Sequence, residues 1–593
     1  MQAGVPMNDA EPHVGAKTAI KHAFLQCRSA FAAVAVFSFV VNLFILTLPL
    51  YMFSVFDKVL SSYSMATLGM LFAMALFALG IQGAVDIARS AVLIEIGNFL
   101  DRNLTSRLLH ASLAHSIKRG SARGTGALQK FTQIKTFLTS NSIYSIMDVP
   151  WIPLFMGVLF LMNPIVGMVS IVGALILGGL AILNDRLSRT ALMRAQQAMN
   201  PAYKRAAAAA RNADVVEAMG MTPTIVRHWH QYTEQSMMHQ SIASRRAAMV
   251  GAASKWARMV IQISIMSSAA LQMIQPGSTM SPGVMMASVI LVGRALMPLE
   301  SMIGSYRTTL EAIAAYKEMD EILNSMVERP RLSVVPPQPT GHISVENVTY
   351  TVPGIDRPIL SNVSFEIPAG EIIGVIGPSG AGKTTLATLM VGIEPATSGS
   401  IRLDGTDVYA WPSEDLGRYL GYLPQSVELF DGSVRDNICR LETNAQPEAI
   451  IKAAELAGLL EIIQRLPKEY DTSVGEAGTL MSGGQRQRIG LARALYGDPL
   501  FVVLDEPNSN LDSQGEEALK NALHALKARG CTVMLIAHRI NVLQYVDKVL
   551  ILRDGVVHKY APRDEVVGPV PAQPKPQVAA SQEPAAIQNR ATS

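Results

Sequence analysis

The sequence has few cysteines, few aromatic residues and little net charge. Its 593 residues include three cysteines, Cys27, Cys439 and Cys531, which lie far apart and show no metal-ligand spacing. This pattern excludes a disulfide-rich scaffold and favours reduced thiols. Aromatic residues make up 6% of the chain, which fits packed helices better than a sheet-rich sandwich. A net charge of +3 is too small to indicate nucleic acid as a partner.

Apolar residues, by contrast, are abundant. They make up 49% of the chain, against 16% for charged residues, and the mean hydropathy is +0.26. These values lie on the membrane side of the range that is usual for soluble proteins. The length is too great for one ordinary domain and indicates about three or four.

Six apolar stretches predict a membrane domain in the first half of the chain. The first four are long enough, or nearly so, to cross about 30 Å of hydrocarbon. The last two have Arg258 or Arg294 in or beside them. The alternative is a set of buried core helices in a large soluble protein. The stretches cover residues 31–51, 66–85, 143–161, 165–183, 256–274 and 284–298.

The basic residues between these stretches predict an orientation. The connections 86–142 and 184–255 carry eight and ten Lys or Arg residues, whereas the other three connections contain only Lys58. Because basic loops stay in the cytoplasm, both termini are expected to be cytoplasmic. The two basic connections are rich in Ala, Leu, Met, Gln and Arg, which predicts helices that extend well beyond the bilayer.

Two charged positions in this half each allow two interpretations. Arg294 either lines a translocation path, since a buried charge in a membrane is costly, or it extends its guanidinium to the membrane surface or pairs with Glu300 near the cytoplasmic end. The Asp57-Lys58 pair is either a local surface pair or a contact for a partner.

A Pro-rich break at 329–340 leads into a second domain. β-type alternation in HISVENVTYTV is followed by the apolar strand EIIGVIG and then by GPSGAGKTT, a phosphate-binding loop. Glycines let backbone N–H groups surround phosphates, and the helix that follows directs its positive end at them. Lys383 is expected to neutralise β- and γ-phosphate oxygens, and the Thr384 hydroxyl to bind Mg²⁺. The phosphate loop consists of Gly377, Pro378, Ser379, Gly380, Ala381, Gly382, Lys383, Thr384 and Thr385.

Two later strands end in candidate catalytic side chains. FVVLDEP is an apolar strand that ends at Asp505, which is expected to hold Mg²⁺. Glu506 is placed to act as general base on the attacking water, although a strand-end carboxylate can also be structural. TVMLIAHR ends in His538, which is suited to contact the γ-phosphate and the water. The sequence therefore predicts an ATP hydrolase.

The set GPSGAGKTT, GYLPQ, MSGGQ, LDEP, SNLD and AHR resembles the nucleotide-binding domain of ABC transporters, and the six stretches resemble the exporter type. The resemblance implies a multidomain chain, with an all-α six-helix transmembrane domain that has long cytoplasmic helix extensions, followed by an α/β P-loop domain. It also implies that Gln425 senses Mg²⁺ and the γ-phosphate, and that Asp512 couples two sites across a dimer interface. The turn of Ser482, Gly483, Gly484 and Gln485 would cap the γ-phosphate of ATP bound to the partner subunit.

One position departs from the pattern of that family. Val352 stands where an adenine-stacking aromatic residue usually precedes a Pro-Gly turn. Tyr350 lies two residues earlier on the same face of a strand, so it either stacks on adenine or belongs to the sheet core.

The chain contains one phosphate loop and one SGGQ turn, with no internal repeat of either. A composite ATP site needs both, so the resemblance implies a half-transporter that works as a homodimer with two equivalent ATP and Mg²⁺ sites.

Further motifs indicate which kind of substrate the transporter exports. DEPNSNLD, LPLYMFSVFDKVL and LVGRALMPLE resemble the protease and lipase exporter branch of bacterial type I secretion ATPases. That resemblance implies an inner-membrane location and export of unfolded polypeptides with a C-terminal signal, through an inner-membrane adaptor and an outer-membrane channel. The alternatives are a lipid, peptide or drug exporter and, from a different class, an ATP-gated channel or regulator.

The expected organisation has five parts. A short cytoplasmic segment (1–29) precedes the transmembrane domain (30–328), the Pro-rich linker (329–340) and the nucleotide-binding domain (341–560). The Pro-, Ala- and Gln-rich tail (561–593) is expected to be disordered. Membrane lipid is the other expected partner, and the absence of a folded N-terminal extension argues against branches that carry a peptidase-like domain there.

Overall fold

The computed structural model describes residues 19–119, 124–275, 280–324, 337–352, 354–355, 357–537 and 540–567. The chain divides into two compact units, Met1–Val327 and Glu328–Ser593, and each is described by itself.

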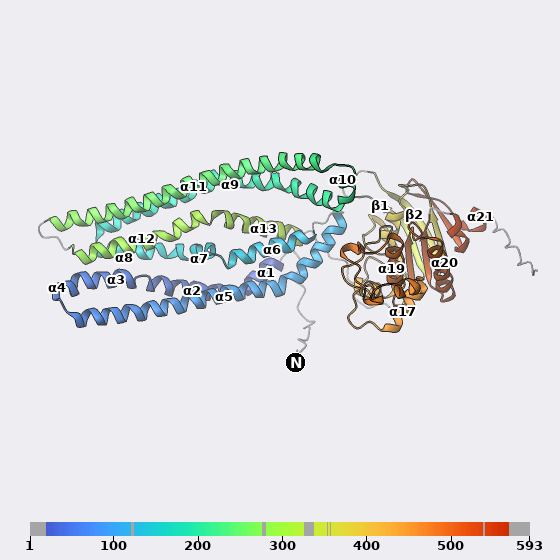
Figure 1. Cartoon of the computed structure of the whole chain (residues 1–593), viewed down its shortest axis with the longest axis horizontal. Coiled ribbons are helices and arrows are strands. Elements are labelled where there is room, and N and C mark those ends of the chain that lie inside the picture. The colour runs from blue at the N-terminus through green and yellow to red at the C-terminus, as the bar shows by residue number, and fades with distance from the viewer. Residues whose placement is uncertain are drawn as a thin grey trace, which may run out of the picture. The chain divides into compact units, whose positions relative to one another are not determined.

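Over its described residues, the first unit consists of helices and the short connections between them (Figure 1). Its elements are α1 (Ala19–Gln26), α2 (Arg28–Phe44), α3 (Thr47–Ser54), a π-helical turn (Val55–Val59), α4 (Leu60–Ser62), α5 (Met65–Arg119), α6 (Gly124–Leu138), α7 (Asn141–Asp148), a 3₁₀ turn (Val149–Trp151), α8 (Ile152–Met162), α9 (Pro164–Arg211), α10 (Ala213–Ala218), α11 (Thr222–Ile274), α12 (Pro282–Gly304) and α13 (Tyr306–Asn324).

Six helical segments among the described residues are long and apolar enough to cross a membrane. Each contains one of the six stretches predicted from the sequence, so the prediction of six membrane-length helices is confirmed. The segments are Arg28–Ser62, Met65–Ile117, Asn141–Met162, Pro164–Arg211, Thr222–Ile274 and Pro282–Gly304.

Three of these helices are much longer than a bilayer requires. Helices α5, α9 and α11 contain 55, 48 and 53 residues, whereas about 20 residues cross the hydrocarbon core. Helices α9 and α11 lie side by side (Figure 1). Two side chains of α11 brace the pair, because Ser236 donates to the carbonyl of Ala195 at 3.0 Å and Arg246 to that of Leu187 at 2.8 Å.

A tight turn between α8 and α9 is fixed by one asparagine. The Asn163 carboxamide oxygen accepts the N–H groups of Ile165 and Val166 at 3.0 and 3.2 Å, and Pro164 occupies the first helical position. The amide nitrogen of Asn163 donates to Gln272 at 2.8 Å. The turn therefore caps α9 and ties it to the end of α11.

Two ambiguous charged positions now have defined surroundings. Asp57 accepts the N–H of Gly283 at 2.8 Å and the hydroxyl of Ser281, so it caps the first turn of α12. Glu300 pairs with Arg258 at 2.7 Å, which argues against the alternative in which it pairs with Arg294. Arg294 is exposed in the single chain.

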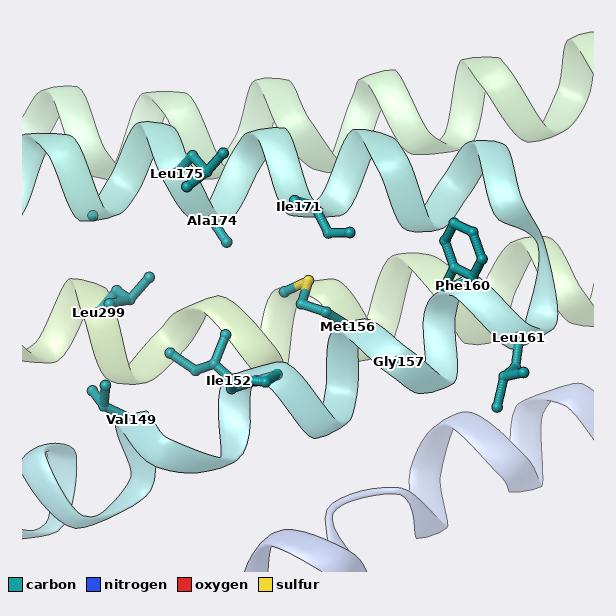
Figure 2. Close-up of a pocket in the computed structure, with 12 residues that line it drawn as sticks. Val149, Ile152, Met156, Gly157, Phe160, Leu161, Ile171, Ala174, Leu175 and Leu299 are labelled. Atoms are coloured by element: carbon teal, nitrogen blue, oxygen red, sulfur yellow. The ribbon is translucent and has the colours of Figure 1, made fainter.

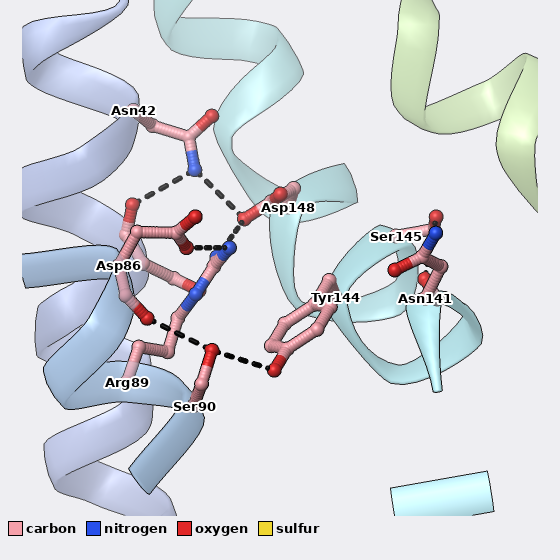
Figure 3. A network of polar contacts seen from close by, with 9 residues as sticks. Asn42, Asp86, Arg89, Ser90, Asn141, Tyr144, Ser145 and Asp148 are labelled. Atoms are coloured by element: carbon pink, nitrogen blue, oxygen red, sulfur yellow. Dashed lines mark hydrogen bonds and ion pairs between the residues drawn. The ribbon is translucent and has the colours of Figure 1, made fainter. Parts of the chain in front are cut away.

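A buried polar network joins α2, α5 and α7 (Figure 3). The Arg89 guanidinium is 5% exposed and donates to Ser38 at 3.0 Å, Asp148 at 3.1 Å and Asp86 at 2.7 Å. Asn42 also donates to Asp148 at 2.8 Å. Asp148 is the last residue of α7, directly before the Pro-containing turn Val149–Trp151. The network therefore holds the break between α7 and α8 against α2 and α5.

The Arg89→Met variant is expected to lose about 3–5 kcal/mol of stability, because it leaves the Asp148 carboxylate largely buried without its cation. Denaturant unfolding of the purified protein in detergent measures the change. Arg102→Met removes an exposed cation from the same helix and should change stability by less than about 0.5 kcal/mol. Adding Asp148→Leu to Arg89→Met should restore much of the lost stability. Equal stability of Arg89→Met and Arg102→Met would contradict the prediction.

The second unit contains two sheets and their covering helices. The strands are β1 (Ile343–Tyr350), β2 (Leu360–Ile367), β3 (Ile372–Ile376), β4 (Ser398–Leu403), β5 (Thr406–Asp407), β6 (Leu420–Leu423), β7 (Phe501–Asp505), β8 (Thr532–Ile536), β9 (Lys548–Arg553) and β10 (Val556–Pro562). The helices are α14 (Lys383–Met390), α15 (Ser413–Tyr419), α16 (Val434–Ile438), α17 (Pro447–Leu456), α18 (Leu460–Gln464), α19 (Gly483–Leu495), α20 (Ser513–Ala528) and α21 (Asp564–Val567), with 3₁₀ turns at Glu469–Asp471, Glu476–Gly478 and Ile540–Tyr545.

The order of the strands decides which loops meet at one edge of the parallel sheet. One sheet runs β2-β1-β4-β5 and is antiparallel, and the other runs β10-β9-β3-β8-β7-β6 with all its strands parallel except β10. Helix α14 buries Leu386 and Met390 in a core shared by both sheets. A second core joins the parallel sheet to α19 and α20 through Ile489 and Leu519. Parallel strands bring their carboxyl ends to one edge, where ligands bind in α/β sheets.

The predicted start of the tail is too early. Strand β10 continues to Pro562 and α21 covers Asp564–Val567, so regular structure extends past the predicted boundary at residue 560. The rest of the predicted tail lies outside the described residues.

Candidate functional site

The phosphate loop connects β3 to α14 and its backbone requires glycine. A side chain at Gly377 would meet the carbonyl oxygen of Leu552 at 2.1 Å, and Gly380 and Gly382 have φ values of 81° and 96°. Such values favour glycine, because they cost other residues strain. The last three residues of the loop, Lys383 to Thr385, form the first turn of helix α14, so the unpaired N–H groups of that turn would face a bound phosphate.

Lys383 is held within this loop. Its ammonium group donates to the carbonyls of Gly377 and Pro378 at 2.8 and 3.0 Å, and the residue is 6% exposed. Burial lowers the pKa of Lys383, and the carboxylates of Glu506 and Asp505 oppose that shift. The opposing charges indicate that the ammonium group lies in the field of both carboxylates.

A cavity of about 760 Å³ opens beside the loop; it is called the nucleotide cavity below. It brings together eight of the predicted site residues, which come from three separate segments of the chain. Its lining includes Ser379, Gly380, Gly382, Lys383, Thr384, Thr385, Gln425 and Glu506. Such a volume lies within the range of small-molecule sites.

The two acidic residues at the end of β7 lie differently. Asp505 is the last residue of the strand and is fully buried, whereas Glu506 lines the nucleotide cavity. Glu506 has a φ of 50°, a left-handed conformation that is uncommon for a residue with a side chain. Its N–H still donates to the carbonyl of Ile536 at 3.1 Å. The chain thus turns out of the sheet at Glu506 and directs this residue to the cavity.

The SGGQ turn (482–485) begins α19. Ser482 accepts the N–H of Gln485 at 3.3 Å, and Gln485 accepts the N–H of Ser482 at 2.8 Å, a capping box. Among the described residues, the lining of the nucleotide cavity includes no member of this turn. Asp512 caps α20 by accepting the N–H of Gly515 at 2.8 Å and also lies outside that lining. His538 lies outside the described residues.

Tyr350 is not among the described residues that line the nucleotide cavity, which favours the second of its two interpretations, a place in the sheet core. The residue is 9% exposed within the core between the two sheets, and its hydroxyl donates to Glu394. Val352 also packs against this core. Besides the predicted residues, the described lining of the nucleotide cavity includes Ile355, Arg357, Pro358, Ile359 and Asp554. Sequence reasoning missed all five residues. Asp554, for example, follows β9 and reaches the site because β9 pairs with β3.

Tyr350→Phe is therefore expected to leave the KM for ATP unchanged, since it removes only a hydroxyl that faces Glu394. Arg357 lines the cavity, where its guanidinium could stack on the adenine ring of ATP. Arg357→Ala should therefore raise the KM for ATP about twofold to fivefold, because such stacking contributes about 0.5–1 kcal/mol at an exposed site. Steady-state phosphate release measures both. A larger rise in Tyr350→Phe than in Arg357→Ala would contradict this placement.

A second cavity lies in the membrane unit (Figure 2). It measures about 780 Å³ and is lined by apolar residues of α8 and α9, with Val149 and Leu299 at its edge. Met156 of α8 and Ala174 of α9 point into the space between the two helices (Figure 2). Because its described lining contains only apolar residues, this cavity suits hydrocarbon better than a polypeptide backbone, whose N–H and C=O groups need partners.

Comparisons with known proteins cover both units. The family model described as "ABC transporter" matches residues 360–509, and the one described as "ABC transporter transmembrane region" matches residues 31–298. The type I secretion system ATP-binding protein PrsD of Rhizobium meliloti is 39% identical over 92% of this chain and 94% of the relative. The cyclolysin secretion/processing ATP-binding protein CyaB of Bordetella pertussis is 28% identical over 90% of this chain and 75% of the relative. A solved bacterial Atm1-family ABC exporter with ATP bound has the same fold, with a TM-score of 0.80, 21% identity and coverage of 91% of this chain and 96% of that one.

Proposed function

Because this chain belongs to the ABC transporter family and couples ATP hydrolysis to transport across a membrane, we propose that its cargo is an unfolded polypeptide with a C-terminal secretion signal. The observation that carries the proposal is the similarity to PrsD over 92% of the chain, which includes both units. The export route would begin in the cytoplasm and cross a bacterial inner membrane. An inner-membrane adaptor and an outer-membrane channel would complete it.

The ATP sites would form in a homodimer. ATP would bind in the nucleotide cavity of one subunit, with its phosphates against residues 377–385 and its γ-phosphate capped by the SGGQ turn of the partner subunit. Lys383 would neutralise phosphate oxygens. The Glu506 carboxylate would accept a proton from the attacking water, and Gln425 would report the occupied site to the membrane helices. His538 would contact the γ-phosphate, and Asp512 would couple the two sites.

The donor groups at this site fit Mg²⁺. Thr384 offers a hydroxyl, Gln425 an amide oxygen and Asp505 a carboxylate, and Mg²⁺ prefers oxygen ligands of this kind. Thr384 and Gln425 line the nucleotide cavity, and Asp505 ends the strand beside it. A magnesium ion bound there would offset negative charge on the phosphate oxygens.

An export assay tests the proposal. The chain would be produced with a candidate adaptor, an outer-membrane channel and a polypeptide that carries a C-terminal signal. Secreted polypeptide should appear in the medium with the wild type and disappear with Glu506→Gln. Deleting the C-terminal signal from the cargo is the matched control. Export that persists with Glu506→Gln, or without the signal, would reject the proposal.

The apolar cavity between α8 and α9 favours a second candidate, a lipid or drug exporter. Lipid that stimulates ATP hydrolysis by the purified protein, together with a failure to secrete the signal-bearing polypeptide, would support this alternative.

A further inference from the structure

The loop that begins at the catalytic candidate Glu506 is held near both ends by α19. Residues 506–512 are called the coupling loop here. Gln487 donates to the carbonyl of Pro507 at 3.2 Å, and the Arg488 guanidinium donates to the carboxylate of Asp512. The two side chains are 1% and 6% exposed. Successive positions of one helix therefore anchor the start and the end of this loop.

Arg488 also fixes the helix and the loop to the rest of the unit. Its second terminal nitrogen donates to the carbonyl of Gly458 at 3.2 Å, in the turn that follows α17. The Asp512 carboxylate accepts the N–H of Gly515 in the first turn of α20. These contacts, the Gly515 N–H foremost, lower the pKa of Asp512. A planar guanidinium can reach two acceptors at once, which the single ammonium of a lysine cannot reproduce.

The first turn of α19 touches the middle of the same loop. A Cβ atom at Gly484 would lie 3.1 Å from the carbonyl oxygen of Asn510, and one at Gly483 would lie 3.8 Å from the Cβ of Asn510. The SGGQ turn thus packs directly on the coupling loop. Helix α19 meets the loop at its start, middle and end, so a displacement of the SGGQ turn is transmitted to the loop through packed atoms and hydrogen bonds.

We propose that Gln487 and Arg488 are positioning residues that make α19 and the coupling loop move as one body. The SGGQ turn at one end of this body would contact ATP of the partner site, while Glu506 at the other end serves the ATP of its own subunit. Occupancy of one site would thereby set the position of the general base in the other. This inference rests on the proposed homodimer with two composite sites.

The test compares three variants of the full-length chain in lipid nanodiscs. Arg488→Lys and Gln487→Leu each remove a link between α19 and the coupling loop. Arg493→Lys is the matched control, because its guanidinium lies on the same helix but donates to the carbonyl of Glu428 at 3.2 Å and lies 5.4 Å from the ring of Phe430. Phosphate release is measured as a function of ATP concentration, and binding of a fluorescent non-hydrolysable ATP analogue is measured separately.

Arg488→Lys should lower kcat about tenfold to a hundredfold, since small misplacements of a catalytic group have effects of this size. Its Hill coefficient should fall towards 1, while the affinity for the analogue stays near that of the wild type. Gln487→Leu should change the same quantities in the same direction, and Arg493→Lys should change none of them. A merely structural role would lower the melting temperature and the fraction of active protein without changing the Hill coefficient.

A folded Arg488→Lys or Gln487→Leu protein with the wild-type kcat and Hill coefficient would overturn the inference. If Arg488→Lys fails to fold, Gln487→Leu decides the matter, because it removes a neutral link with a side chain of similar size. A wild type that hydrolyses ATP with a Hill coefficient of 1 and migrates as a monomer would reject the two-site proposal itself, and the inference with it. The experiment therefore distinguishes a failure of the positioning role from a failure of the proposed homodimer.

Discussion

Glu506→Gln is expected to bind ATP as the wild type does and to hydrolyse it about 10²- to 10⁴-fold more slowly, the usual contribution of a general base. The carboxylate lines the nucleotide cavity and is turned out of the sheet by the left-handed backbone at this residue. Glutamine has the same size and can still hold a water by hydrogen bonding, but it cannot accept the proton. Single-turnover phosphate release and binding of labelled ATP separate the two effects.

Glu517→Gln is the matched control for this change. Glu517 lies on α20, where it pairs with Lys520 at 2.9 Å and is largely exposed. Its neutralisation should leave turnover unchanged. Hydrolysis by Glu506→Gln at more than about a tenth of the wild-type rate would show that another group activates the water.

Lys383→Met is expected to weaken ATP binding about tenfold to a hundredfold, because a hydrogen bond to a charged group contributes about 1.5–3 kcal/mol. The methionine keeps the length of the buried stem but removes the ammonium group that Gly377 and Pro378 hold in place. Equilibrium titration with a fluorescent ATP analogue measures the loss. Lys452→Met removes an exposed ammonium group that pairs with Asp498 at 2.7 Å and should not change the affinity. Equal affinities in the two variants would contradict the role given to Lys383.

Much of the fold followed from local patterns. Hydropathy alone located the six membrane-length helices, and the comparisons confirm the predicted family and its ATP hydrolase activity. The phosphate loop was recognisable because glycines are required there by backbone geometry, as Gly377 and Gly382 illustrate. Residues from that loop, Gln425 and Glu506 then meet in one cavity.

Contacts between distant segments were not predictable in the same way. The order of parallel strands decides that Asp554 joins the nucleotide cavity, and no local pattern encodes this order. The sequence left two interpretations of Tyr350 open, because alternation along a strand cannot distinguish a core face from a ligand face. One interpretation paired Glu300 with Arg294, the nearest cation in the sequence. Its partner in the structure is Arg258, which lies on another helix. The contacts of α19 with the coupling loop had no sequence signal of their own.

The lengths of α9 and α11 have a mechanical consequence. At 1.5 Å per residue these helices measure roughly 70–80 Å, of which about 30 Å suffices for the hydrocarbon core. A tilt of about 10° at the membrane would therefore swing an end some 40–50 Å away by roughly 8 Å. Such leverage requires stiffness, and Pro201 interrupts the hydrogen bonding inside α9. Ser236 and Arg246 donate to carbonyls of α9 before Pro201, and the rings of Tyr203 and Trp229 meet after it at 5.9 Å. Helix α11 therefore supports α9 on both sides of the proline, and without these contacts the displacement transmitted along α9 would be smaller.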